Sequence, residues 1–109
     1  MPESPGLELA FVTAPDVETA ARIGRALVEE RLAACVNVVP GITSIYRWKD
    51  AVETETEVLL LVKTLATRGA DLDARVRELH PYEVPEVVRL DVVGGSLPYL
   101  DWVRSEVSS

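Results

Sequence analysis

Hydrophobic positions near the start of the chain change from an alternating to a helical spacing. Residues 7–13 begin with alternation and end in apolar side chains, which is typical of a strand covered on at least one face. Asp16 then offers a carboxylate that can cap the first turn of a helix. Beyond it, apolar or small side chains recur three or four positions apart, at Ala20, Ile23, Gly24 and Leu27. The pattern predicts a strand over residues 7–13 and an amphipathic helix over residues 17–31.

Two long extended segments follow. Residues 34–49 are rich in β-branched and aromatic side chains and are interrupted once, by Pro40-Gly41, and residues 52–64 come after a short turn. Each segment is at least twice as long as an ordinary strand of about five or six residues. A domain of 109 residues cannot cover both faces of so long a hairpin, so we expect part of it to project. Pro40-Gly41 is the expected bend or bulge.

The remaining chain predicts a helix, a strand and a short terminal helix. Thr67 is the expected cap of a helix that ends before Pro81, and residues 86–93 alternate as a fourth strand. Ser96 is the expected cap of the last helix. The order β-α-β-β-α-β predicts an α+β fold of the ferredoxin-like, split βαβ type, with a four-stranded antiparallel sheet and two helices on one face.

We expect one domain over residues 1–109, with flexible ends at residues 1–6 and 105–109. The sheet face away from the helices needs a cover, and a second subunit is the simplest one because the chain offers no second helical layer. Tyr46 and Trp48, two residues apart, share one face of the projecting hairpin. Exposed aromatic side chains are common anchors of interfaces, so we interpret this pair as interface residues. A role in stacking on a ligand is the alternative.

The composition of the chain argues against two classes of binding partner, nucleic acid and membrane. The 18 Asp and Glu residues against 11 Lys and Arg residues give a net charge of −7, which argues against nucleic acid because phosphate binding needs a basic surface. The longest apolar run, residues 58–62, is far shorter than the roughly 20 residues that span a bilayer. Residues 1–6 lack the basic and apolar regions of a signal peptide. A single cysteine excludes an intrachain disulfide and indicates a reducing compartment. We therefore expect a cytoplasmic protein with no nucleic-acid or membrane partner.

Motifs that would indicate an enzyme are missing from the sequence. Gly94-Gly95 lacks the spacing of either nucleotide-binding fingerprint, and neither a G-x-S-x-G elbow nor an H-E-x-x-H metal motif occurs. Cys35 and His80 would be the only nucleophilic pair, and nothing in the sequence brings them together. We expect no catalytic activity.

Cys35 and His80 each allow two interpretations. The apolar neighbours of Cys35 favour a small buried side chain, and the alternative is a thiolate ligand for a soft metal such as Cu(I). His80 stands between a helix end and Pro81, where its ring can lie over the last helical carbonyls; the alternative is a metal ligand or proton carrier. Because the chain has one histidine, no site with two imidazoles can form within a single chain.

A row of carboxylates, at Glu53, Glu55 and Glu57, occupies alternate positions and so shares one face of a strand. We interpret the row as a solvated face opposed by cations across the turn, for which Arg47 and Lys49 are available. A row that collects hard cations is the alternative.

Five segments stand in order over residues 9–104: Thr13-Ala14-Pro15-Asp16, Ala33-Ala34-Cys35-Val36-Asn37, Tyr46-Arg47-Trp48, His80-Pro81-Tyr82-Glu83 and Tyr99-Leu100-Asp101-Trp102. They resemble the CutA divalent-cation tolerance proteins. The resemblance implies a ferredoxin-like homotrimer in which the hairpin of one subunit extends the sheet of the next, with Tyr46, Trp48, Pro40 and Gly41 at the interface. It also implies a cytoplasmic location and a role in tolerance of copper and other divalent cations.

The same resemblance implies metal ligands. Copper-binding bacterial relatives have a cysteine just before the Thr-Ala-Pro segment and two adjacent histidines before Pro-Tyr, whereas this chain has Val12 and Leu79-His80. We therefore expect weak binding of copper, zinc or another divalent cation, not obligatory for the protein, through His80, Cys35 and Glu83. The family's trimers also resemble nitrogen-regulatory signalling trimers. An alternative function is therefore the binding of a small effector in a cleft between subunits.

Overall fold

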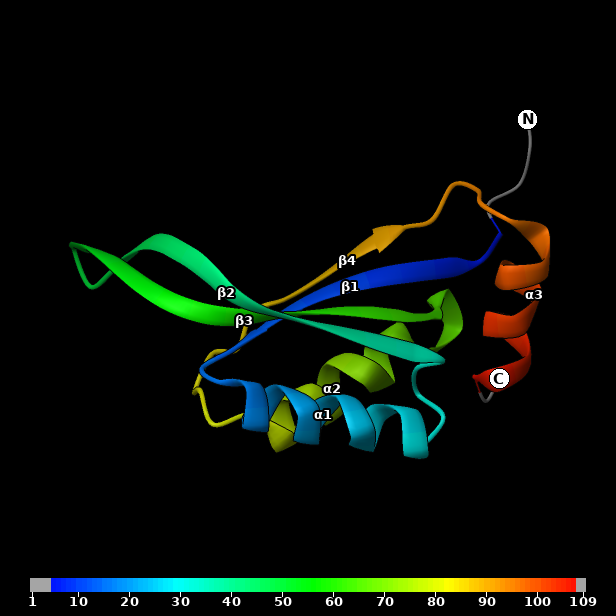
Figure 1. Ribbon diagram of the computed structural model, residues 1–109, viewed down its shortest axis with the longest axis horizontal. Coiled ribbons are helices and arrows are strands. Elements are labelled where there is room, and N and C mark those ends of the chain that lie inside the picture. The colour runs from blue at the N-terminus through cyan, green and yellow to red at the C-terminus, as the bar shows by residue number, and fades with distance from the viewer. Residues whose placement is uncertain (1–4, 108–109) are drawn as a thin grey trace.

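The computed structural model describes residues 5–107, which form a four-stranded antiparallel sheet with helices against it (Figure 1). The strands are β1 (Leu7–Ala14), β2 (Cys35–Trp48), β3 (Ala51–Leu65) and β4 (Val87–Asp91). The helices are α1 (Val17–Glu29), α2 (Gly69–Leu79) and α3 (Leu97–Glu106), with a short 3₁₀ helix, η1 (Ala66–Arg68), before α2. The sheet order is β2-β3-β1-β4. The strand order in the sheet and the order of elements along the chain together confirm the predicted split βαβ arrangement.

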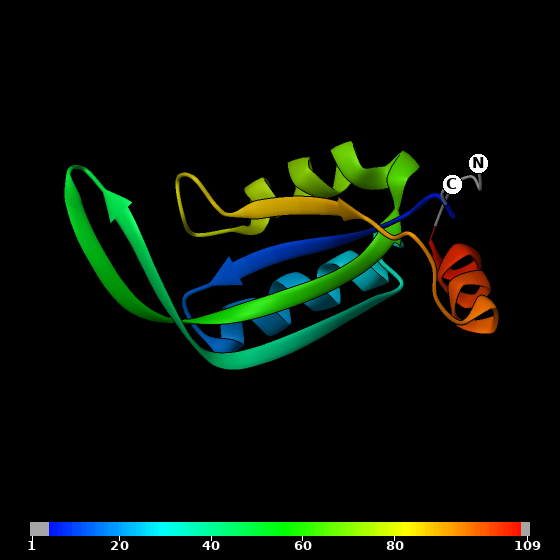
Figure 2. The same ribbon diagram turned by 90° about the horizontal axis from the view of Figure 1, so that it is seen from above.

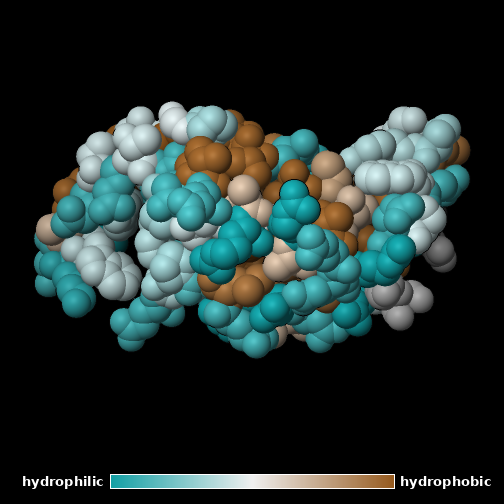
Figure 3. Space-filling model, turned by 60° about the horizontal axis from the view of Figure 1, so that its bottom comes forward, coloured by the Kyte–Doolittle hydropathy of each residue, from teal (hydrophilic) through white to brown (hydrophobic). Residues whose placement is uncertain are grey.

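Helices α1 and α2 lie side by side on one face of the sheet, and α3 lies at one end of it (Figures 1 and 2). The core between the sheet and the first two helices contains alternate residues of the two central strands, such as Val12 and Leu60, packed against Ile23 and Leu72. A second cluster joins α3 to the beginning of β1 around Leu7. The helical side in Figure 3 carries hydrophilic side chains with smaller hydrophobic areas between them, as expected of a layer that faces water.

Strands β2 and β3 form the long hairpin. Lys49 and Asp50 connect them, both with positive φ, which is the backbone of a type I′ two-residue turn. Strand β1 pairs with β3 only as far as Val58. Residues 51–57 and their β2 partners therefore extend past the end of β1 (Figure 1). The predicted bulge at Pro40-Gly41 is confirmed, because the β2–β3 register shifts between Val39 and Ile42.

The other face of the sheet is apolar and carries neither α1 nor α2. The register places on it seven large hydrophobic side chains: Leu9, Phe11, Val39, Leu59, Leu61, Val88 and Leu90. We call this set the outer apolar face. Val88 and Leu90 are about half exposed, at 49% and 46%. The other members of the set are partly exposed, and a cluster of neighbouring apolar side chains left open in this way is typical of an interface.

Two predicted elements, the first helix and the fourth strand, are longer than the observed ones. Helix α1 ends at Glu29 instead of residue 31, because Arg31 adopts a left-handed φ of 58° and the chain turns there. The turn lets the backbone N–H groups of Leu32 and Ala33 donate to the Leu27 carbonyl, and it brings both side chains into the core. The fourth strand covers only residues 87–91.

Of the three predicted helix caps, only Asp16 makes a capping hydrogen bond. Asp16 caps α1 as expected, its carboxylate accepting from the Thr19 N–H at 2.7 Å. Thr67 lies inside η1 and does not cap α2, which begins after Arg68 without a side-chain cap. Ser96 holds the cap position of α3, but its side chain makes no capping bond.

The predicted flexible ends are only partly described. Residues 1–4 and 108–109 lie outside the described residues. Residues 105 and 106, expected to belong to a flexible end, form the last turn of α3. Val107 is buried in the second cluster, which explains why the helix continues to this point.

Candidate functional site

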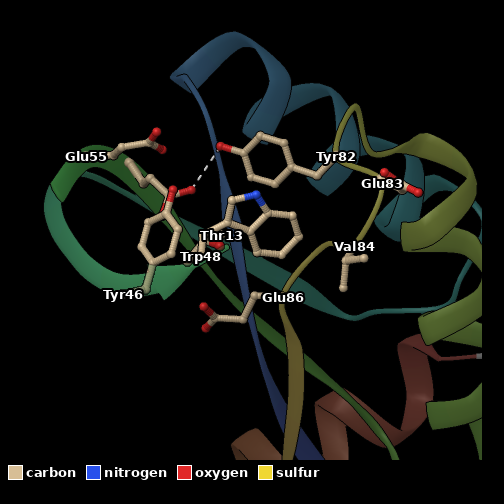
Figure 4. Close-up of a pocket in the computed structure, with 9 residues that line it drawn as sticks. Thr13, Tyr46, Trp48, Glu55, Tyr82, Glu83, Val84 and Glu86 are labelled. Atoms are coloured by element: carbon tan, nitrogen blue, oxygen red, sulfur yellow. Dashed lines mark hydrogen bonds between the residues drawn. The ribbon is translucent and has the colours of Figure 1, made fainter. Parts of the chain in front are cut away.

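A cavity of about 440 Å³ opens where the hairpin, the end of β1 and the loop after α2 meet (Figure 4). The rings of Tyr46, Trp48 and Tyr82 gather near its centre, with Glu55 and Glu86 toward its margins (Figure 4). The full lining is Thr13, Tyr46, Trp48, Glu55, Glu57, Tyr82, Glu83, Val84 and Glu86. Three aromatic rings and four carboxylates therefore surround one space.

The hairpin register explains how its two strands supply this lining. Tyr46 pairs directly with Glu53 and Ser44 with Glu55, so the aromatic pair and the row of carboxylates share one face. The expected pairing of that row with cations is wrong. Arg47 pairs with Val52 and therefore lies on the opposite face, and Lys49 belongs to the turn.

His80 holds the loop that forms the far wall of the cavity. It occupies the C-cap position of α2 and is 7% exposed. Its Nε2 lies 2.6 Å from the Thr13 carbonyl oxygen, which can only accept, so Nε2 carries the proton. Its Nδ1 accepts from the Tyr82 backbone N–H at 3.1 Å. Both ring nitrogens are thus engaged, and neither offers a free lone pair to a metal.

Tyr82 and Glu57 form the buried contact of the site. The Tyr82 hydroxyl donates to Glu57 Oε2 at 3.0 Å, and the Glu57 residue is only 6% exposed. Burial and then this hydrogen bond raise the pKa of Tyr82. Burial, followed by the hydrogen bond to Glu55, likewise raises the pKa of Tyr46. Both phenols therefore remain neutral donors at ordinary pH.

We expect Tyr82→Phe to lower the free energy of unfolding by about 1–2 kcal/mol at neutral pH, since Glu57 loses its buried donor. The raised pKa of Tyr82 means that the folded protein holds this proton more tightly than the unfolded chain. The contribution of Tyr82 is therefore complete below about pH 10 and is lost as the pH rises through the pKa of the folded state. Urea unfolding across this alkaline range checks the prediction. As the pH rises through this range, the free energy of unfolding should fall less for Tyr82→Phe than for the wild type. An equal fall in both proteins would contradict the prediction.

The carboxylates of the cavity lack cations of their own. The ion pairs of residues 5–107 involve other acidic groups, and none joins a lysine or arginine to Glu55, Glu57, Glu83 or Glu86. Lys49 lies near Trp48, with Nζ 5.9 Å from the ring centroid, but it makes no ion pair with these groups. The cavity is therefore a region of uncompensated negative charge.

Cys35 lies far from this cavity. It is half-buried at the start of β2, and its Sγ is 4.0 Å from Nζ of Lys63, which also bonds to Asn37. The register places Cys35 level with Leu9 of β1, whereas His80 contacts Thr13. Four residues of strand separate these levels by about 13 Å. The structure thus does not bring the predicted ligands Cys35 and His80 together in one chain.

Glu83 lies on the cavity wall, in the same loop as His80. Throughout residues 5–107, no three His, Cys, Asp or Glu side chains are grouped so as to hold a metal ion. The donor set expected from the sequence therefore does not form a metal site within one chain. In the same described part of the chain, no helix is long and apolar enough to cross a membrane.

Two roles in the site were not predicted from the sequence, that of Tyr82 as a donor and that of Glu57 as a buried acceptor. The two residues are 25 positions apart, and no local pattern signals their contact. Pro40 and Gly41, expected at a trimer interface, are exposed at the bulge.

Comparison with known proteins places the chain in a family. Residues 8–106 match the family model described as CutA1 divalent ion tolerance protein. The chain is 55% identical to the divalent-cation tolerance protein CutA of Thermus thermophilus, over 89% of this chain and 94% of that one. It is 52% identical to human protein CutA over 92% of this chain, and it spans 56% of the human protein's length. A solved T. thermophilus Cut A1 structure superposes with a TM-score of 0.91 at 52% identity, covering 94% of this chain and 99% of that chain.

The names of two other relatives include a compartment. A rice CutA is called chloroplastic, and a CutA structure from Archaeoglobus fulgidus is called periplasmic. The compartment therefore varies among relatives with this fold. The match to the family model extends over nearly the whole chain, and so this protein belongs to the CutA1 divalent ion tolerance family.

Proposed function

We propose that this protein acts as a homotrimer in the tolerance of divalent cations. The observation that carries the assembly is the outer apolar face, which the chain's own helices α1 and α2 do not cover. Tyr46 and Trp48, 37% and 49% exposed, supply further aromatic surface on the extended hairpin. Pro40 and Gly41 bend the hairpin between these two surfaces. Sedimentation of the wild type should give the mass of three 11.9 kDa chains, and a single-chain mass would contradict the proposal.

We propose that the protein binds copper or zinc with low affinity. Tight binding needs several donors at fixed distances, and residues 5–107 of one chain do not assemble them. Donors from neighbouring subunits are therefore needed for any site with more than one or two ligands. The role in cation tolerance rests on family membership, and the family names support it over a signalling trimer. We propose a cytoplasmic location, which the single cysteine supports because it fits a reducing compartment.

We expect His80→Gln to bind Cu²⁺ as weakly as the wild type, within about threefold, because both ring nitrogens already have partners in the protein. Titration calorimetry measures this, with Cys35→Ser as a matched variant at the other end of the sheet. Zn²⁺ is titrated in parallel. A tenfold weaker affinity in His80→Gln alone would show that the imidazole leaves Tyr82 and binds the metal.

A further inference from the structure

Glu57 is the starting point, because this residue is only 6% exposed and its side chain lines a cavity without a cation. The Tyr82 hydroxyl donates to one oxygen, while a carboxylate can accept about four hydrogen bonds. Burying a charge costs free energy unless an opposite charge compensates it. No lysine or arginine of residues 5–107 does so here. A cation that entered the cavity would therefore meet a carboxylate that no lysine or arginine of these residues pairs with.

The shape of the cavity favours an organic cation over a metal ion. A metal ion needs several oxygens converging within about 2.0–2.6 Å of one point, and no such group of side chains exists in the described residues. Instead, the carboxylates of Glu55, Glu57 and Glu86 are distributed around a space of about 440 Å³. That volume is within the usual range for small-molecule pockets.

The aromatic rings define the chemistry further. Tyr46, Trp48 and Tyr82 present ring surfaces between the carboxylates (Figure 4). Ring faces attract ammonium and guanidinium groups and also pack against aliphatic chains. Lys49 already places its ammonium near the Trp48 ring, so this ring interacts with a cation in the chain itself.

We propose that this cavity binds a small aliphatic organic cation with ammonium or guanidinium groups at its ends. One charged end lies at Glu57, the chain of methylene groups packs between the aromatic rings, and the other end reaches Glu55 or Glu86. This site goes beyond the proposed role in metal tolerance and does not depend on it. The copper titration can fail without affecting it, whereas Tyr46 and Trp48 also belong to the proposed trimer interface, so the site is tested on the assembled protein.

The test uses the full-length protein with 1,4-diaminobutane as the probe and 1,4-butanediol as its neutral match. EDTA is present to exclude metal bridging. Because the chain has two tryptophans, ¹⁵N-labelled indole groups report the site by NMR. We expect the diamine to shift the Trp48 signal in a saturable way, to leave Trp102 in α3 unchanged, and to bind far more tightly than the diol.

Substitutions in strand β3 test which carboxylate binds the diamine. We expect Glu57→Gln, which preserves shape and can still accept from Tyr82, to weaken diamine binding about tenfold or more. Glu55→Gln, at an exposed position on the same strand, should weaken it severalfold, so the proposal remains testable even if Glu57→Gln folds poorly. Glu53→Gln removes the same charge from the same strand but does not line the cavity, and it should have little effect.

Three results would overturn the proposal. The first is equal binding of diamine and diol. The second is an equal loss of affinity in Glu57→Gln, Glu55→Gln and Glu53→Gln, which indicates general attraction to an acidic protein. The third is no saturable diamine binding by the wild type, and a crystal of the assembled protein then shows whether an arginine or lysine of a second copy is seated in the cavity.

Discussion

Replacing Leu61 with arginine is expected to release single chains from the trimer. Leu61 is in the middle of the outer apolar face, paired with Phe11 of β1 and Asn37 of β2. In the proposed assembly this position is covered by a neighbouring subunit. A buried guanidinium without a counterion costs several kcal/mol, which is a large fraction of the stability of an interface. Sedimentation velocity at several protein concentrations should show the mass change from three chains to one.

A matched control is Val28→Arg, on the exposed side of α1. Val28 is a 40% exposed hydrophobic residue on the helical layer, so the substitution adds the same charge away from the outer apolar face. This variant should sediment like the wild type. If Leu61→Arg also keeps the wild-type mass, the outer apolar face is not the interface, and the assembly proposed here fails.

Replacing the neighbouring Leu60 with alanine is expected to lower the free energy of unfolding by about 2–5 kcal/mol. Leu60 points to the other face of the same strand, is fully buried, and packs in the core beneath α1 and α2. The loss combines the transfer of the deleted methyl groups with the cavity that they leave. Urea unfolding at one fixed protein concentration measures it, because the stability of an oligomer depends on concentration.

Val28→Ala is the comparison for this second substitution, since a partly exposed valine leaves no closed cavity. We expect it to change the free energy of unfolding by less than about 1 kcal/mol. A loss below that value for Leu60→Ala would show that the core adjusts around the missing side chain.

These two leucines also show what the sequence can predict. The run from Val58 to Val62 is apolar at every position, which is typical of a strand covered on both faces. The helical and alternating spacings along the chain were sufficient to predict the order of elements, and the lack of a second helical layer was sufficient to predict the need for a cover. The alternation of a strand assigns neighbours to opposite faces whatever the tertiary structure, and for this reason the prediction of the fold succeeded.

The site was much less predictable, because it depends on long-range geometry. Glu57 looks like its neighbours Glu53 and Glu55 in sequence, yet it is buried while Glu55 is exposed. The difference arises where the hairpin passes the loop that carries Tyr82, and that position depends on the bulge and the register together. The distance between Cys35 and His80 likewise follows from strand pairing, which no single residue reveals.

The described ends of the chain meet beside α3, where Arg104 Nη2 donates to the Pro5 carbonyl at 2.9 Å. The cavity is at the opposite end of β1, beyond Thr13. Modules attached at residues 5 and 107 would therefore start close to each other and about a full strand length away from the cavity mouth. The fold is thus suited to presenting two different modules side by side on one small carrier.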